Sequence, residues 1–94
     1  MRKGITRTGF ECEFDERILD DMRFLDLLAD LLEDDVSELE AIAKTSKLVT
    51  MLLGKDNKKA LYDHLAALND GFVPSTVVME EVFDVMKADG DIKN

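Results

Sequence analysis

The sequence predicts a mainly α-helical fold, a small bundle of about four short helices with an N-terminal β-strand or hairpin arm. Two observations predict it: apolar and polar residues alternate over 10–14, and apolar residues recur with a helical period from 16 onward. A chain of 94 residues, 46% of them apolar, is expected to form one domain with one core. We divide that domain into an extended arm (1–14), a helical region (15–90) and a tail (91–94).

The arm holds the strand pattern. Phe10, Cys12 and Phe14 share one face of an extended segment, and the glutamates between them lie on the other face. Residues 5–8, which precede Gly9, are the candidate partner strand of a hairpin. An isolated two-stranded ribbon is only marginally stable in water, so the arm is expected to pack on the helices or pair with another chain.

The first helical region covers residues 16–34. Its apolar side chains occupy about 220° of the helix circumference, whereas a surface helix commonly needs a stripe only a little wider than about 100°. Asp20 and Asp21 would interrupt this arc in a straight helix. We therefore expect the helix to start or restart there, with one of these aspartates as its N-cap.

This helix carries the candidate partner-binding residues, which are Phe24, Leu27, Leu28 and Leu31. Phe24, Leu27 and Leu31 lie on a side of the apolar arc separate from Leu25, so one flank can cover the core while the other meets a second copy or a client protein. The alternative is a central helix whose whole arc is buried among the other helices. The sequence leaves both possibilities open.

Two further helices precede Pro74. The second is expected to start after Asp35 or Ser37, because each opens a sequence that resembles a capping box, and to end at Gly54. The third is expected to have Asp56 as its N-cap and to end in a turn over 69–71. The apolar residues at helical spacing, expected to face inward, are Leu39, Ile42, Val49, Leu52, Leu53, Ala60, Leu61, Leu65 and Leu68.

The fourth helix is expected to follow Pro74, because Pro-Ser-Thr before an apolar periodic segment is typical of a helix start. Gly90 is its expected end. The residues expected to face inward are Val78, Met79, Val82, Phe83 and Met86.

The chain is acidic, and its charge is unevenly distributed. Twenty-one Asp and Glu outnumber twelve Lys and Arg, which gives a net charge of −9. Thirteen of the acidic residues lie in 11–40, whereas 41–60 carries a net charge of +4. A negative surface disfavours nonspecific binding to nucleic acid, which depends on neutralising phosphates, and adhesion to anionic membranes. We therefore expect neither nucleic acid nor a membrane as a partner.

Three features predict a cytoplasmic protein. The single cysteine cannot form an internal disulfide, so nothing indicates an oxidising compartment. The basic N-terminus is not followed by the apolar core of a signal peptide. No apolar run approaches the ~20 residues that cross a bilayer.

No motif of a catalytic or metal site is found. His64 is the only histidine and Cys12 the only cysteine, which is too few ligands of the required types for zinc. Whether these two residues meet in space as a nucleophile and base is left open. The oxygen ligands of a calcium loop are missing before both Gly71 and Gly90. We expect a protein that is not an enzyme and has no cofactor or metal.

Six segments follow one another in an informative order: TGFECEFDE (8–16), LDD (19–21), FLDLLAD (24–30), LLG (52–54), YDHL (62–65) and DGFVP (70–74). Together they resemble the tail assembly chaperones of long-tailed phages and prophages that infect Gram-positive bacteria. The resemblance spans most of the chain, from about residue 8 to residue 86.

The resemblance implies a non-enzymatic chaperone that binds the tape measure protein and keeps it soluble during tail morphogenesis. Such proteins act in the host cytoplasm and are not part of the mature virion. Many also have a longer form, made by a programmed frameshift, whose extra domain is thought to recruit tail tube protein. The C-terminal Ile92-Lys93-Asn94 is compatible with an adenine run suited to such a frameshift.

The residues themselves fit a chaperone that binds a long helical client. Apolar strips can take up client helices, and the acidic block keeps the assembly in solution. Several copies on one client gain from multivalency, so a homo-oligomer is expected. In such an oligomer the basic segment from Lys44 to Lys59 would meet the acidic block of a neighbouring copy.

Two other classes of protein are alternatives. An acidic inhibitor or DNA mimic would occupy a basic cleft and would present its carboxylates as an exposed array. An acyl-carrier protein ranks third, because neither Ser37 nor Ser75 lies in the Asp-Ser-Leu motif that carries the prosthetic arm. The leucine-rich arc of 16–34 favours binding of an apolar client over both.

Overall fold

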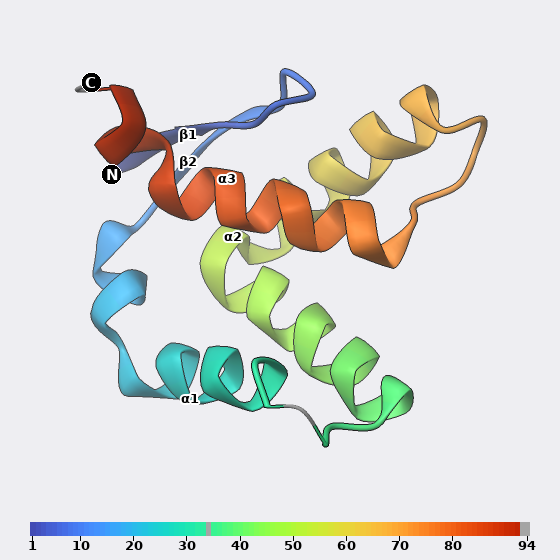
Figure 1. The fold of residues 1–94 in the computed structure, drawn as a ribbon. Coiled ribbons are helices and arrows are strands. Elements are labelled where there is room, and N and C mark those ends of the chain that lie inside the picture. Colours follow the sequence, from blue (N-terminus) through green and yellow to red (C-terminus); the bar gives the residue numbers. More distant parts are fainter. Residues whose placement is uncertain (34, 93–94) are drawn as a thin grey trace.

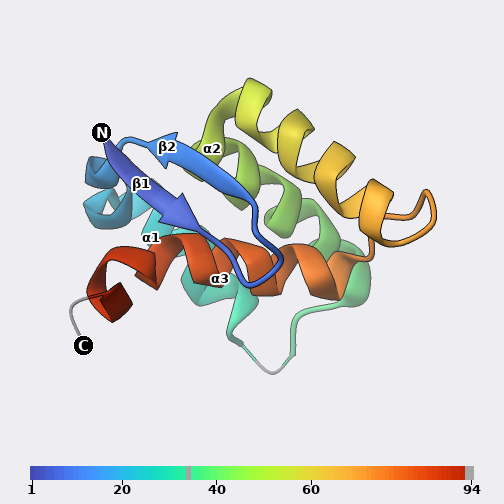
Figure 2. The same cartoon turned by 90° about the horizontal axis from the view of Figure 1, so that it is seen from above.

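The computed structural model describes residues 1–33 and 35–92 and shows the predicted mainly helical fold with an N-terminal hairpin (Figure 1). Seen from above, β1 runs beside α3 and β2 runs beside α2 (Figure 2). The elements in chain order are β1 (Arg2–Ile5), β2 (Glu11–Phe14), a 3₁₀ turn (Glu16–Asp20), α1 (Met22–Leu31), α2 (Glu38–Leu68) and α3 (Ser75–Ile92).

The two strands form an antiparallel hairpin in which Gly4 is opposite Cys12. The prediction that residues 5–8 form the partner strand is wrong by several positions. The strand β1 ends at Ile5, and the chain turns after it. The turn closes early because Thr6 N–H donates to the Phe10 carbonyl at 2.9 Å while the Thr6 hydroxyl accepts from the Phe10 N–H at 3.0 Å. A threonine expected in a strand therefore closes the loop.

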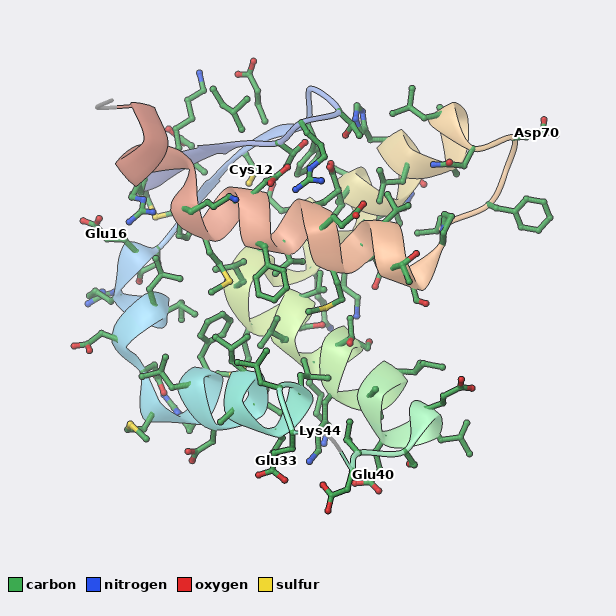
Figure 3. The ribbon with its side chains drawn as sticks, in the orientation of Figure 1. Cys12, Glu16, Glu33, Glu40, Lys44 and Asp70 are labelled. Atoms are coloured by element: carbon green, nitrogen blue, oxygen red, sulfur yellow. The ribbon has the colours of Figure 1, made fainter. Side chains whose placement is uncertain are left out.

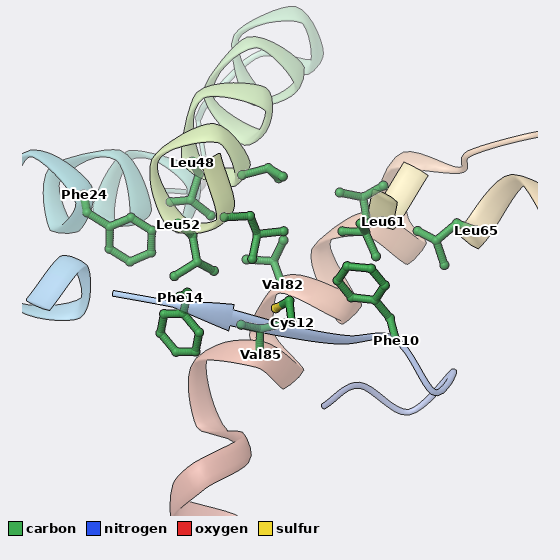
Figure 4. Close-up of a cluster of buried hydrophobic side chains, with 13 residues drawn as sticks. Phe10, Cys12, Phe14, Phe24, Leu48, Leu52, Leu61, Leu65, Val82 and Val85 are labelled. Carbon is green, nitrogen blue, oxygen red and sulfur yellow. The ribbon is translucent and has the colours of Figure 1, made fainter. Parts of the chain in front are cut away.

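The hairpin packs on the helices through one face, as the alternating pattern predicts. Phe10, Cys12 and Phe14 are all buried in the shared hydrophobic core (Figure 4). Gly4 lies on the same face of the sheet, and a Cβ there would lie 2.8 Å from Val85 Cγ1 of α3. Only glycine lets β1 approach α3 this closely, because a larger residue would displace the helix or the strand.

Helix α1 starts where the acidic interruption was expected. Asp21 is its N-cap, with an extended backbone and a side chain that accepts from the Arg23 N–H at 2.9 Å. Asp20 is the last residue of the preceding 3₁₀ turn. The α-helix ends at Leu31, before the expected limit, and Asp34 lies outside the described residues.

Helix α2 is bent at Gly54, which the sequence predicts as a helix end. Ser37 is the N-cap, and its hydroxyl accepts from the Glu40 N–H at 3.2 Å. Gly54 has φ 78° and ψ 169°, which is not helical, so α2 consists of a first limb (38–53) and a second limb (55–68) that diverge from it (Figure 1). We call this bend the elbow. Asp56 was expected as an N-cap but lies within the second limb, in its first turn. A negative charge there stabilises the helix through its dipole.

Helix α2 ends in the predicted turn. Asn69 is the C-cap, Asp70 has a positive φ of 57°, and the Gly71 N–H donates to the Ala66 carbonyl at 2.8 Å. Helix α3 then begins at Ser75, directly after Pro74, as expected.

Two expectations for α3 are wrong. The helix does not end at Gly90 but continues to Ile92, and the expected tail is therefore helical up to that residue, while 93–94 lie outside the described residues. Phe83 does not face inward: it is 36% exposed, whereas Val85, two residues further on, is buried. The hairpin lies against α3, so the buried side of this helix is turned toward β1.

Several positions expected in the core of α2 are also exposed. Leu39 is 80% exposed and Ile42 is 56% exposed, because the first turns of α2 extend beyond the part that α1 and α3 cover. Ala60 and Leu68 of the second limb are exposed as well. The buried hydrophobic residues are Phe10, Cys12, Phe14, Phe24, Leu48, Val49, Leu52, Leu53, Leu61, Leu65, Val78, Val82 and Val85.

Candidate functional site

The partner-binding flank expected on α1 is mostly turned inward. Phe24 is fully buried and belongs to the same core as Leu52 of α2 (Figure 4). Leu27, Leu28 and Leu31 are half-buried and pack against that core. Of the two possibilities that the sequence leaves open, the structure shows the buried one for Phe24, because the first limb of α2 packs along α1 and covers it.

An apolar groove lies between the first limb of α2 and the start of α3. Two adjoining hollows, with volumes of about 280 Å³ and 380 Å³, share Ile42 and Thr45 of α2 and Ser75 of α3. Further apolar lining comes from Ala41, Val73, Val78 and Met79. We call this concavity the groove.

The polar side chains of α2 in the groove are largely satisfied within the helix. The Thr45 hydroxyl donates to the Ala41 carbonyl at 2.7 Å, and the Ser46 hydroxyl accepts from the Lys58 ammonium at 2.9 Å. Hydroxyls that bond to the preceding turn need no further partner. The lining beside Ile42 therefore loses little when an apolar ligand displaces water.

The sequence contains a signal for the groove that the helical-period reading missed. Leu39 and Ile42 are three residues apart, but the polar stretch 44–47 separates them from the apolar residues 48–49 and 51–53. A core helix of this length would carry an apolar residue in that interval. The gap marks the point where α2 leaves the core.

A second hollow of about 480 Å³ lies at the elbow and is cationic. It is lined by Thr50 of the first limb and by Lys55, Lys58, Lys59, Tyr62 and Asp63 of the second. The Lys58 ammonium lies 5.8 Å from the centre of the Tyr62 ring, a cation–π distance. Partial burial raises the pKa of Tyr62, so its hydroxyl is protonated and neutral at physiological pH. We call this the elbow hollow.

A buried polar network fastens the hairpin turn to the helices. The Thr8 hydroxyl donates to Glu81 Oε1 at 2.5 Å, and His64 Nε2 lies 3.1 Å from both oxygens of Thr8. The Arg7 guanidinium makes two hydrogen bonds, of 2.9 and 3.0 Å, to the carboxylate of Asp84. These bonds hold the pKa of Asp84 below its usual range. The network joins three elements and fits a structural role.

His64 and Cys12, the pair left open by the sequence, are engaged separately. The hydrogen bonds of His64 within the described residues go to Thr8, and its ring packs at 5.6 Å from the ring of Phe10. Cys12 is buried under the hairpin, and this burial raises the pKa of its thiol. A reactive cysteine needs the opposite shift, toward the thiolate.

The acidic residues lie mainly on the surface. Glu16, Glu33 and Glu40 project outward, the last two at the end of the molecule where α1 passes into α2 (Figure 3). Other carboxylates form ion pairs with cations of the same chain, as Asp30 does with Lys44 at 2.7 Å. Further pairs are Asp15–Arg17, Asp21–Arg23, Glu11–Lys3 and Asp63–Lys59.

Two further properties concern residues 1–33 and 35–92. They contain no group of three His, Cys, Asp or Glu side chains arranged to hold a metal ion. None of their helices combines the length and the apolar content that a bilayer crossing requires.

Comparisons with protein-family models, with curated proteins and with solved structures find no match to this chain. The functional reading therefore depends on the residues, the groove and the resemblance of the sequence.

Proposed function

We propose that this protein is a phage tail assembly chaperone, which binds the tape measure protein and keeps it soluble while the tail is built. It acts without catalysis, in the host cytoplasm, and is absent from the finished virion. A longer frameshifted form would bring tail tube protein to the same client. The ordered segments from TGFECEFDE to DGFVP support the assignment, since they resemble this class of protein.

The groove is the observation that carries the proposal. A chaperone for a long helical client needs an accessible apolar concavity, and the groove between α2 and α3 supplies one. Leu39 and Ile42 expose apolar surface along one side of it. This surface replaces the Phe24 flank as the candidate client site, with the half-buried Leu27, Leu28 and Leu31 of α1 as a secondary contact.

The net charge of −9 suits the same role. A bound, otherwise aggregation-prone client remains dispersed when each copy of its chaperone adds negative charge to the complex. Several copies along one tape measure protein would gain from multivalency, so we include self-association in the proposal.

The proposed function is tested by co-expression with the tape measure protein encoded beside the gene. The wild-type chain should move most of that client into the soluble fraction and co-purify with it. Ile42→Ser should reduce both effects several-fold, because it places a hydroxyl in the groove. Ile5→Ser is the matched control, since Ile5 is also exposed but lies on the hairpin.

Two outcomes would overturn this function. One is a client that stays insoluble with the wild-type chain present, and the other is an equal effect of the two serine variants. The acidic inhibitor or DNA mimic is less well supported, because many carboxylates are paired with cations of the chain itself and do not form a free array.

A further inference from the structure

We propose that the groove binds a partner helix in one placement, with acidic residues of that helix at the elbow hollow and basic residues at the opposite end. This inference names the kind of client segment that fits and rests on the proposed use of the groove. It is carried by the order of charges along α2 and by the continuity of the two concavities.

One ridge of the first limb runs the whole length of this surface. Glu38, Ile42, Ser46 and Thr50 are four residues apart and therefore follow one side of the helix. Ile42 and Ser46 line the groove, and Thr50 lines the elbow hollow. Tyr62 lines both concavities, so they adjoin each other. From Glu38 to Thr50 the ridge is about 18 Å long, the length of about twelve residues of a bound helix.

The end of the surface at the start of α2 is acidic. Glu38 lies in the first turn of α2, one turn before Ile42, and is exposed. Glu80 of α3 lines the same hollow of the groove as Ala41 and Ile42, and its contact with the exposed Arg7 is 3.9 Å long. An exposed contact of this length is weak, so both carboxylates remain available to a cation of a partner.

The elbow end is basic, and its central charge is uncompensated. The Lys58 ammonium donates to Ser46 Oγ and Thr50 Oγ1, both at 2.9 Å, and to the Ser46 carbonyl at 3.4 Å. All three acceptors are neutral, and among residues 1–33 and 35–87, whose side chains the structure describes, no carboxylate lies within 4.0 Å of this ammonium. Lys55 is exposed beside it. A carboxylate that enters the elbow hollow would meet the ammonium groups of Lys55 and Lys58. It would not have to displace a carboxylate of this chain from Lys58.

A chain with a net negative charge is expected to repel an acidic segment unless it has a local basic site. The elbow hollow is a local exception, since 41–60 carries +4 in a molecule of −9. An apolar stripe alone could lie in the groove in either direction, whereas opposite charges at its two ends select one placement. A segment acidic along its whole length would be repelled at Glu38 and Glu80.

The test uses two synthetic helical peptides of about 18 residues that share one Leu/Val stripe. The dipolar peptide has glutamates in its first turn and lysines in its last turn, and the neutral peptide has glutamine at all these positions. At low salt the dipolar peptide should bind about tenfold more tightly, a factor that salt reduces. Lys55→Glu should remove this advantage, while Lys3→Glu on the hairpin, the matched control, should retain it.

A nitroxide spin label attached to one end of the dipolar peptide shows by NMR which end of the groove that peptide end occupies. The label at the acidic end should broaden the amide signals of Thr50 and Lys55, and the label at the basic end those of Glu38 and Glu80. Equal affinity of the two peptides, or broadening at both sites by each label, would overturn the placement and leave the groove as a client site. Failure of both peptides to bind would overturn the placement and the groove together.

Discussion

At the scale of single residues, arginines of the chain determine the protonation of several carboxylates. Arg17 and Arg23 donate to the neighbouring Asp15 and Asp21 and lower the pKa of each carboxyl to about 2. Both pairs are on the surface, where solvent screens them and their contribution to stability is small. Asp84 is different, because its side chain is buried between the hairpin turn and α3.

Asp84 is expected to make the free energy of unfolding depend on pH. Its hydrogen bonds from Arg7 lower its pKa in the folded chain below the value of about 3.9 in the unfolded chain. A lowered folded-state pKa gives stability that is fully present above about pH 4 and is lost as the pH falls through the folded-state pKa. Asp84→Asn should therefore reduce the urea midpoint at about pH 7 more than at about pH 2.5.

The control for this prediction is a double-mutant cycle. In an Arg7→Met background the further change Asp84→Asn should have a smaller effect at neutral pH, because the partner that it would lose is already absent. If Asp84→Asn lowers the midpoint equally at both pH values, the pair is not the source of the pH dependence.

At the scale of elements, local signals fixed the helix starts better than the helix faces. Asp21 and Ser37 are N-caps, and each was one of two candidates that the sequence offered, since a cap depends on a few adjacent residues and its hydrogen bond. The break at Gly54 follows from the same local logic. Leu39 and Phe83 were assigned to the core by periodicity alone. Periodicity does not reveal where a neighbouring element stops or which side of a helix it covers. Leu39 lies beyond the covered part of α2, and Phe83 lies on a side of α3 that is not buried.

The elbow depends on the backbone of Gly54 and gives a second prediction. Its φ of 78° and ψ of 169° fall in a region that is essentially restricted to glycine. A Cβ at this position would have no heavy atom within 4 Å, so the cost of a side chain comes from the backbone and not from a clash. Gly54→Ala should lower the free energy of unfolding by about 1–3 kcal/mol in a urea titration.

A D-alanine at position 54, introduced by chemical synthesis, is the matched control. It adds the same methyl group but favours positive φ, so it should retain most of the stability of the natural chain. Identical urea midpoints for the L- and D-alanine proteins would show that the bend does not depend on this backbone conformation.

At the scale of the whole molecule, the groove could not be located from the sequence, although the polar interval 44–47 marks where α2 leaves the core. Residues 22–31 are helical as predicted, but 16–20 form a 3₁₀ turn, and Met22 and Leu32 of the predicted apolar arc are exposed. Phe24 is covered by the first limb of α2, a contact between segments that no local pattern specifies. The groove arises in the same way, since Ile42 and Met79 meet only through the tertiary arrangement of α2 and α3. The sequence did predict that some apolar side chains would remain outside the core.

The charge distribution of the whole chain leads to a prediction on self-association. If the basic segment 44–59 of one copy meets the acidic block of another, the average sedimentation coefficient should fall as salt rises from about 50 to about 500 mM, because the Debye length shortens. The dipolar peptide should also lower it, since its glutamates would occupy the same lysines. Self-association that is insensitive to both would remove the electrostatic basis of the proposed oligomer.

The single thiol under the hairpin has a practical consequence. Cys12 lies on the core-facing side of β2, among the buried residues that the hairpin shares with the helices, and burial keeps its thiol protonated. An alkylating reagent can reach it only when the N-terminal ribbon separates from its support, so the labelling rate measures how often that separation occurs. The alkylation rate of Cys12 therefore reports how often the N-terminal hairpin opens, without any engineered probe.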